Sequence, residues 1–177
     1  MSYSETDHKV LLSEKAIADR LTEIGKQITE SYGNEPITIL ALTNGALVFA
    51  ADLIRQIKCP VRLDTLGVAS YKGRRSTGEL SFRSKPKLGI SGRNILVVDD
   101  ILDTGLTLHG VASWLKRQSP QSVKICVLLD KKITKREEEV KVDWAGFEID
   151  DLFVYGYGLD RDEFDRNLPF IAYVEDE

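Results

Sequence analysis

The sequence contains few of the residues that build zinc sites or disulfide frameworks. It has two cysteines, Cys59 and Cys126, and two histidines, His8 and His109, and these residues are widely separated along the chain. Because a structural zinc site needs closely spaced cysteine and histidine ligands, no such site is expected. Both cysteines lie in apolar runs, so we interpret them as small core residues of a protein from a reducing compartment.

Long hydrophobic segments are also absent. The longest run without a charged residue spans 36–51 and is interrupted by Thr43, Asn44 and Gly45. A membrane helix needs about 20 consecutive apolar residues. The charged N-terminus also lacks the apolar stretch of a signal peptide. We therefore expect a cytoplasmic protein that has no membrane partner.

An excess of positive charge is lacking as well. The 177 residues include 24 Lys and Arg against 28 Asp and Glu, which gives a formal net charge of -4. Such a chain is a poor candidate for nucleic-acid binding driven by phosphate neutralisation, so no nucleic-acid partner is expected. The length and the apolar fraction of 42% are typical of one globular domain, spanning 1–177, with its own hydrophobic core.

Hydrophobic periodicity predicts an alternation of helices and strands. Ser13 begins a segment with apolar residues at helical spacing, and Gly33 is expected to end that helix. Further helices are expected at 46–57 and 106–118, and strands at 37–43, 61–71, 93–100, 122–131, 152–156 and 170–174. This order predicts an α/β fold, a mainly parallel twisted sheet flanked by helices on both faces.

The predicted sheet indicates where a ligand should bind. Ligands on open parallel sheets bind beyond the carboxyl ends of the strands. The residues to examine are therefore those that follow Thr43, Tyr71, Val98, Leu129 and Val154.

The segment VVDDILDTGLT, 97–107, carries the strongest chemical signal. A buried strand is expected to end in Asp99 and Asp100, and Asp103 with a Thr-Gly turn then opens a helix. Backbone N–H groups and hydroxyls at a helix N-terminus can hold a phosphate monoester. Three carboxylates beside a phosphate suit a ligand that also brings hydroxyl groups or Mg²⁺, so the segment predicts a ribose 5-phosphate site. The alternative is that Asp103 and Thr104 only cap a helix and the acid pair marks a strand end.

This segment resembles the phosphoribosyl-pyrophosphate motif of the type I phosphoribosyltransferases. LLDK at 128–131, DLFVYGYGLD at 151–160 and DEFDRNLPFI at 162–171 are similar to the hypoxanthine-guanine branch of that family. The resemblance implies the type I phosphoribosyltransferase fold with a small hood formed by roughly 1–15 and 155–177.

The resemblance also implies an enzyme of purine salvage. Such an enzyme uses Mg²⁺ and transfers the 5-phosphoribosyl group from 5-phosphoribosyl 1-pyrophosphate to hypoxanthine or guanine. The products are IMP or GMP and pyrophosphate. A homodimer or homotetramer is implied as well, with the helix at 46–57 and the region 61–71 at its interface.

For the ribose phosphate, the resemblance implies a role for each residue of the motif. Asp103 corresponds to the general base that takes the purine N7 proton. Asp99 and Asp100 correspond to the acidic pair that faces the ribose hydroxyls and their Mg²⁺, although the first acid is commonly Glu in this branch. The phosphate would bind the turn formed by Asp103, Thr104, Gly105, Leu106 and Thr107.

For the purine and the pyrophosphate, the resemblance implies residues from the second half of the chain. Lys131 corresponds to the lysine that contacts O6 of the base, because an ammonium group has only donors and favours a carbonyl over the amino group of adenine. Phe153 corresponds to the aromatic that stacks on the base, and Val154 to a position whose backbone meets the base edge. Asp160, which is also assigned to the purine site, corresponds to a second Mg²⁺ ligand near the pyrophosphate, and Arg166 corresponds to a ligand of the pyrophosphate.

Each of these positions also has a purely structural explanation. Lys131 could be an exposed lysine, and residues 153–154 could belong to the core of a strand. Arg166 could form a weak surface ion pair with Asp162 or Glu163.

Two loops complete the resemblance. Thr43, Asn44 and Gly45 lie where the family has its pyrophosphate loop, with Thr43 in place of the usual lysine and Asn44 in place of the first glycine. Ser70 and Tyr71 match the pair in the mobile catalytic loop, whose closure excludes water. The alternative for this loop is a polar hairpin.

Two other functions remain open at the level of sequence. The same chemistry with xanthine or another purine is one, because base preference depends on a few contacts in the pocket. A regulator that binds ribose phosphate together with RNA or a partner protein, without catalysis, is the other. The sequence pI of about 5.3 disfavours the regulator, which is expected to have a basic face.

Overall fold

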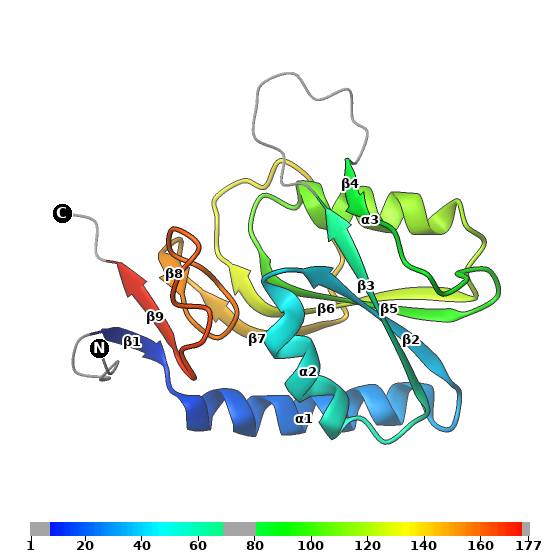
Figure 1. The fold of residues 1–177 in the computed structure, drawn as a ribbon, viewed down its shortest axis with the longest axis horizontal. Helices are drawn as coiled ribbons and strands as arrows, with labels where there is room; N and C mark the ends of the chain where they lie inside the picture. The colour runs from blue at the N-terminus through cyan, green and yellow to red at the C-terminus, as the bar shows by residue number, and fades with distance from the viewer. Residues whose placement is uncertain (1–7, 69–80, 175–177) are drawn as a thin grey trace.

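The structure is a computed structural model that describes residues 8–68 and 81–174, and Figure 1 shows how its elements are arranged. The helices in these ranges are α1 (Glu14–Tyr32), α2 (Ala46–Gln56) and α3 (Leu106–Lys116). The strands are β1 (Lys9–Leu12), β2 (Ile37–Thr43), β3 (Val61–Val68), β4 (Phe82–Ser84), β5 (Asn94–Leu102), β6 (Ser122–Lys131), β7 (Trp144–Ile149), β8 (Phe153–Tyr155) and β9 (Ile171–Val174).

The main sheet has the strand order β4-β3-β2-β5-β6-β7. Strands β3, β2, β5, β6 and β7 pair in parallel, and only the short edge strand β4 is antiparallel. Helices connect β2 to β3 and β5 to β6, which is the usual crossover between parallel strands, and a loop joins β6 to β7. The predicted α/β fold with a mainly parallel sheet is confirmed.

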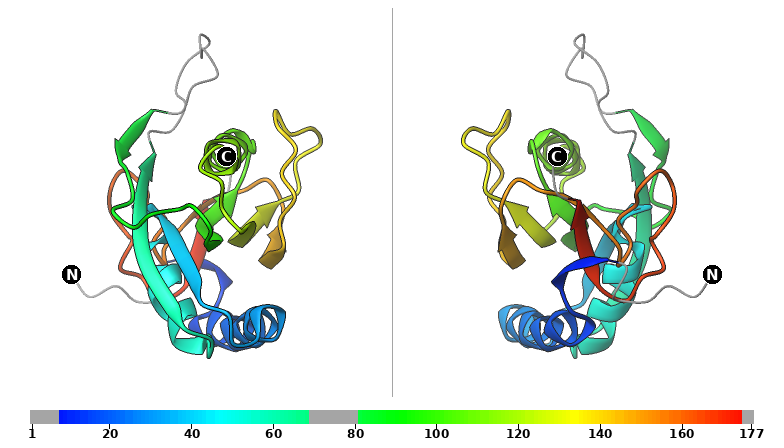
Figure 2. Two further views of the ribbon diagram at one scale, coloured as in Figure 1. Left: turned by 90° about the vertical axis from the view of Figure 1, so that its right-hand side faces the viewer. Right: turned by 90° about the vertical axis from the view of Figure 1, so that its left-hand side faces the viewer.

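Helices cover both faces of this sheet. Helices α1 and α2 lie on one face and α3 lies on the other (Figure 2). Successive residues of β5 point to opposite faces. Ile95 and Val97 belong to the same buried cluster as α3, whereas Leu96 and Val98 belong to the cluster beneath α1 and α2. Burial on both faces explains why the central strands have uninterrupted apolar runs.

Helix α1 forms where the periodicity predicts it. The Ser13 hydroxyl accepts a hydrogen bond of 3.2 Å from the Ala16 N–H, which satisfies one of the free donors of the first turn. The helix ends at Gly33, whose φ of 58° is strained for residues with a side chain. Among the described helices, none is long and apolar enough to cross a membrane.

A second sheet is built from both ends of the described chain. It has the antiparallel order β1-β9-β8, and it forms the small hood expected from the family resemblance. Val154 and Ile171 from this sheet belong to the same buried cluster as α1 and α2, so the two sheets share one core. The expectation that Val154 ends a strand of the parallel sheet is therefore wrong, because β8 pairs only within the hood.

Several boundaries and short strands differ from the prediction. Strand β5 continues past the predicted end at 100 to Leu102, because it stays paired with β6 as far as Asp130. The predicted strand 61–71 is described as far as Val68, and 69–71 lie outside the described residues. Strands β1, β4 and β7 are not predicted by the sequence pattern. These are edge strands of three to six residues, too short for a clear apolar period.

Candidate active site

The turn between β5 and α3 leaves the start of the helix without a side-chain cap. The N-cap residue of α3 is Gly105, which has a φ of 85° and forms no side-chain capping bond. The Thr104 hydroxyl reaches only the Leu106 N–H, at 3.5 Å. The alternative, in which Asp103 and Thr104 only cap the helix, is therefore wrong. A helix N-terminus without a side-chain cap has N–H groups in its first turn that can bind an anion.

The loop between β6 and β7 supports this turn from outside. The Glu138 N–H donates to the Thr104 carbonyl at 3.1 Å. A Cβ atom at Gly105 would lie 3.0 Å from the carbonyl carbon of Glu138 and closer still to its oxygen. The Glu138 carboxylate also lies 3.3 Å from Nδ1 of His109 on α3. Only glycine fits at position 105, because the backbone of the covering loop occupies the space of a side chain.

A cavity of about 390 Å³ opens at this turn, at the carboxyl ends of β2 and β5. Most residues that the sequence analysis proposed for the ribose phosphate and the pyrophosphate line it. Its walls are Leu42, Thr43, Gly45, Val68, Asp99, Asp100, Ile101, Leu102, Asp103, Thr104, Gly105, Leu106, Thr107, Leu108, Glu137, Asp160 and Arg166. The exposed Asn44 is not one of its lining residues, nor are Lys131, Phe153 and Val154, the residues assigned to the base.

The acid pair lies deep in this cavity. Asp99 is 8% exposed, and Asp100 is half-buried. Burial, followed by repulsion from Asp100, raises the pKa of Asp99 well above its usual range. Burial likewise raises the pKa of Asp100, while the Arg166 guanidinium acts in the opposite direction. Two buried neighbouring carboxylates of this kind gain stability when a cation joins them.

The donor set around the pair fits Mg²⁺ better than a metal held by protein ligands alone. The described residues contain no group of three or more Asp, Glu, His or Cys side chains that could hold a metal ion by themselves. Mg²⁺ is commonly bound through one or two carboxylates, with water and substrate phosphates completing its octahedron. Asp160, the third predicted ligand, is already engaged by Arg166 at 2.8 Å and by the Glu163 N–H at 3.0 Å.

Replacing Asp99 by asparagine is expected to stabilise the metal-free protein at neutral pH. The folded state holds a proton at Asp99 more tightly than the unfolded chain, so stability falls as pH rises from the ordinary Asp value of 3.8. Asparagine avoids this loss, and its amide oxygen can still accept the 3.1 Å bond from the Asp100 N–H. Each tenfold change in proton affinity is worth about 1.4 kcal/mol, or several degrees in melting temperature. Thermal unfolding in EDTA from about pH 4 to about pH 8 measures the effect, which should grow with pH.

Asp64 provides a control of opposite sign. Its carboxylate accepts hydrogen bonds from the N–H groups of Thr65 at 2.8 Å, Lys87 at 2.6 Å and Leu88 at 2.7 Å. Burial alone would raise its pKa, but these hydrogen bonds lower the pKa of Asp64 below its usual range. Asp64→Asn should therefore reduce the melting temperature at neutral pH, and by less in acid. If Asp99→Asn melts no higher than the wild type at neutral pH, the argument from burial is wrong.

The loop after β2 packs tightly against the acid pair and the hood. The peptide bond between Thr43 and Asn44 is cis. Gly45, the N-cap residue of α2, has a right-handed φ of -57°. A Cβ atom at Gly45 would lie 2.5 Å from Cγ of Asp100, and one at Gly158 would lie 3.4 Å from the Gly45 carbonyl carbon. The two glycines therefore allow three segments of the chain to meet at the cavity.

Arg166 forms a different ion pair from those considered at the level of sequence. Its guanidinium donates to the Gly158 carbonyl at 2.7 Å and pairs with Asp160 at 2.8 Å. The suggested surface pairs with Asp162 or Glu163 are not formed. Because Arg166 and Asp160 both line the cavity, the pair presents a planar donor group toward it.

The residues assigned to the purine lie around the ends of β6 and β8. Nζ of Lys131 is 3.7 Å from Oδ2 of Asp103 and 3.1 Å from Oδ1 of Asp151. The Phe153 side chain is 53% exposed, so the explanation as a core residue is wrong for this position. Val154 has a buried side chain, which leaves only its backbone to meet a ligand. Ser70 and Tyr71 lie outside the described residues.

Comparison with known proteins decides the family of the chain. Residues 8–162 match the family model described as the phosphoribosyl transferase domain. The chain is also 42% identical over 170 residues to the hypoxanthine-guanine phosphoribosyltransferase of Aquifex aeolicus, and the alignment covers 95% of each protein. The chain belongs to the phosphoribosyl transferase family. Its class is therefore that of a phosphoribosyltransferase enzyme.

Other relatives agree with this assignment. The hypoxanthine phosphoribosyltransferase of Haemophilus influenzae is 40% identical, over 93% of this chain and 94% of that protein. A crystal structure of a hypoxanthine phosphoribosyltransferase from Staphylococcus aureus has a TM-score of 0.91 and 35% identity, covering 97% of this chain and 94% of the other. The resemblance to the hypoxanthine-guanine branch, based on the motifs at 97–107, 128–131 and 151–171, is confirmed.

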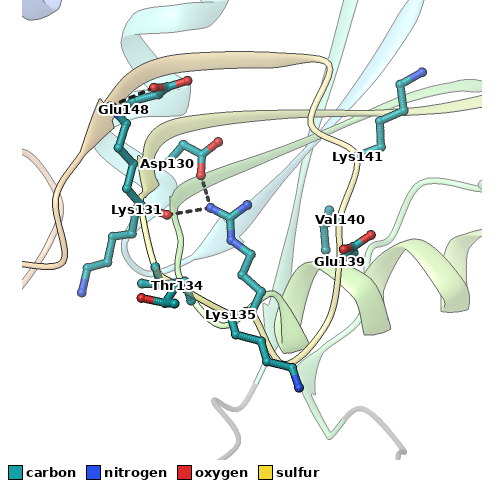
Figure 3. Close-up of a pocket in the computed structure, with 11 residues that line it drawn as sticks. Asp130, Lys131, Thr134, Lys135, Glu139, Val140, Lys141 and Glu148 are labelled. Carbon is teal, nitrogen blue, oxygen red and sulfur yellow. Dashed lines mark hydrogen bonds and ion pairs between the residues drawn. The ribbon is translucent and has the colours of Figure 1, made fainter.

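The loop between β6 and β7 of this phosphoribosyltransferase was given no role from the sequence. A cavity of about 1030 Å³ is lined by this loop and by the ends of β6 and β7. In Figure 3, Asp130 and Lys131 at the end of β6 lie with Glu148 on one side, and Glu139, Val140 and Lys141 lie on the other. The Arg136 guanidinium joins the Asp130 carboxylate to the Lys131 carbonyl, the latter at 2.8 Å. No local pattern could have indicated these contacts, because the loop is a charged run without periodicity.

Proposed function

We propose that the protein catalyses the Mg²⁺-dependent transfer of the 5-phosphoribosyl group from 5-phosphoribosyl 1-pyrophosphate to hypoxanthine or guanine. The products are IMP or GMP and pyrophosphate, which is a reaction of purine salvage. The names of the relatives from Aquifex aeolicus and Haemophilus influenzae support this substrate class.

One observation carries the choice of base. The Lys131 ammonium and the Asp103 carboxylate lie 3.7 Å apart at the edge of the phosphate turn. A 6-oxopurine presents O6 and N7 side by side on one edge. The ammonium can donate to O6 while the carboxylate accepts the proton from N7. Adenine offers an amino group at the same place, and two donors repel each other.

The remaining residues hold the phosphoribosyl group. The uncapped turn from Asp103 to Thr107 would bind the 5-phosphate through its N–H groups. Asp99 and Asp100 would bind the ribose hydroxyls and Mg²⁺, and Mg²⁺ would offset the negative charge of the pyrophosphate. Asp160 would share its carboxylate between Arg166 and the metal.

The base and the leaving group have their own ligands. Phe153, whose ring is exposed, would stack on the purine, and the backbone of Val154 would meet its edge. The guanidinium of Arg166 and the backbone of the Thr43–Gly45 loop would hold the pyrophosphate. Ser70 and Tyr71 would close over the reacting atoms and exclude water.

A parallel assay of four bases tests this function. Purified protein with Mg²⁺ and 5-phosphoribosyl 1-pyrophosphate should convert hypoxanthine and guanine and should hardly convert adenine. Xanthine is included because a relative from Tritrichomonas foetus, 34% identical, is named a hypoxanthine-guanine-xanthine phosphoribosyltransferase. A higher kcat/KM for xanthine than for hypoxanthine and guanine would mean that xanthine is the preferred base. Conversion of none of the four would refute catalysis and favour a regulator that binds ribose phosphate.

A further inference from the structure

An acidic residue that was given no role from the sequence, Asp151 at the start of the 151–160 motif, contacts the lysine assigned to the base. Oδ1 of Asp151 lies 3.1 Å from Nζ of Lys131, and the contact satisfies the geometry of a hydrogen bond. This distance is shorter than the 3.7 Å between the same ammonium and Asp103. The Lys131 side chain is only 12% exposed, so most of its stem is covered by the protein, and these two carboxylates lie beside its ammonium.

The fold brings Asp151 to this place through strand register. Lys131 is the last residue of β6 and pairs with Ile149, the last residue of β7. The Lys132 N–H donates to the Ile149 carbonyl at 2.7 Å, which extends the pairing by one step. A tight turn follows, in which the Leu152 N–H donates to the Asp150 carbonyl at 2.8 Å. Asp151 lies in this turn, at a fixed distance from the end of β6.

The same turn leads directly to the exposed aromatic. Phe153, the first residue of β8, comes two positions after Asp151. Asp151 therefore lies in the chain between the lysine's strand partner and the ring proposed to stack on the purine. The Asp151 carboxylate contacts the Lys131 ammonium, and the carboxylate of Asp103, in the turn after β5, also lies close to it.

An adjacent ion pair shows what an ordinary surface contact looks like here. Lys132 pairs with Glu148 on β7 at 3.1 Å, and their side chains are 60% and 66% exposed. The pair of Lys131 with Asp151 has the same distance, and Asp151 has the same exposure of 66%. The difference is the burial of the lysine side chain, which is 60% exposed in Lys132 and 12% exposed in Lys131. Glu148 is therefore a matched control for Asp151.

We propose that Asp151 is a positioning residue that holds the Lys131 ammonium in place for the carbonyl oxygen of the base, which rests on the proposed function. A lysine ammonium has three donors. Asp151 takes one and Asp103 lies near a second, which leaves a third directed toward a carbonyl acceptor. Without Asp151 the four-carbon stem is free to rotate, and the ammonium is drawn toward Asp103, away from the position that O6 occupies.

The consequence concerns the base and not the sugar phosphate. In Asp151→Ala, kcat/KM for hypoxanthine and the affinity for IMP should each fall about tenfold, as expected for loss of a directed charged donor. The loss in kcat/KM should come mainly from a higher KM for the base. The affinity for ribose 5-phosphate, which has no base, should stay within about twofold. Asp151→Glu restores a carboxylate and should recover part of the loss.

The experiment compares four proteins, namely wild type, Asp151→Ala, Asp151→Glu and the control Glu148→Ala. Steady-state rates with hypoxanthine and calorimetric titrations with IMP and with ribose 5-phosphate are measured on each. Glu148→Ala should match the wild type in all three. Equal loss of IMP and ribose 5-phosphate binding in Asp151→Ala would mean a general structural defect and would overturn the proposal, as would no loss at all.

The two levels of hypothesis fail in different ways. If the wild type converts no 6-oxopurine, the proposed function is wrong, whatever Asp151 does. If the wild type is active and Asp151→Ala has the same KM for hypoxanthine and the same affinity for IMP, only the positioning role of Asp151 is wrong. If Glu148→Ala weakens IMP binding as much as Asp151→Ala, a nonspecific loss of negative charge explains the effect and the proposal fails.

Discussion

Replacing Asp103 by asparagine should lower turnover about 10²–10⁴-fold, which is the contribution of a positioned general base. Asparagine has nearly the same shape as aspartate but cannot take a proton from N7 of the base. The Asp103 side chain is half-exposed, and its distance to Lys131 is 3.7 Å, so the substitution removes only a weak ion pair from the fold. The affinity for IMP and the melting temperature should therefore change little. Single-turnover rates and a calorimetric titration with IMP measure the two effects separately.

Asp150→Asn is a matched control for this experiment. It makes the same chemical change at an exposed acid one residue before Asp151, in the turn after β7. Its turnover should equal that of the wild type. If turnover of Asp103→Asn is unchanged, Asp103 is not the base. If binding and turnover fall by the same factor, Asp103 holds the ligand and another group takes the proton.

The central part of the fold could be predicted because its signals are local. The apolar runs of β2, β5 and β6 are buried on both faces, and each run is followed by a polar residue, namely Thr43, Asp99 and Asp130. The helix caps at Ser13 and Gly33 are equally local. The hood could not be placed in this way. Strands β1 and β9 pair although they lie at opposite ends of the chain. The four-residue sequence of β1 has no local pattern that specifies such a partner.

The candidate site likewise has a part that could be predicted from the sequence and a part that could not. The 97–107 motif contains the acid pair, the turn and the helix start in one segment, so its place at the cavity follows from the strand order. The roles assigned to its residues stay predictions. Two contacts around the site could not be predicted: the Glu138 N–H donates to Thr104 of the motif, and Asp151 pairs with Lys131, and both acids lie outside regular secondary structure. Their contribution depends on the register of β6 with β7.

Gly45→Ala should reduce kcat/KM for 5-phosphoribosyl 1-pyrophosphate by about 10²-fold, as expected for a misplacement of roughly 1 Å in a reacting group. The backbone of Gly45 is right-handed, with φ of -57° and ψ of -44°, so alanine can adopt it without strain. The conflict is with one side chain, because the new Cβ would lie 2.5 Å from Cγ of Asp100 and closer still to Oδ2. The carboxylate can rotate away at little cost in stability. It then leaves the position from which it would bind ribose and Mg²⁺.

Gly89→Ala is the matched control, because a Cβ atom there would have no other heavy atom within 4 Å. Both variants should fold and melt close to the wild type, and only Gly45→Ala should lose activity. A double-mutant cycle with Asp100→Ala isolates the cause. In that background the carboxylate is gone, so adding Gly45→Ala should have little further effect. If Gly45→Ala reduces kcat/KM by the same factor with and without the Asp100 carboxylate, the explanation through Asp100 is wrong. The substitution then lowers activity by changing the Thr43–Gly45 loop itself.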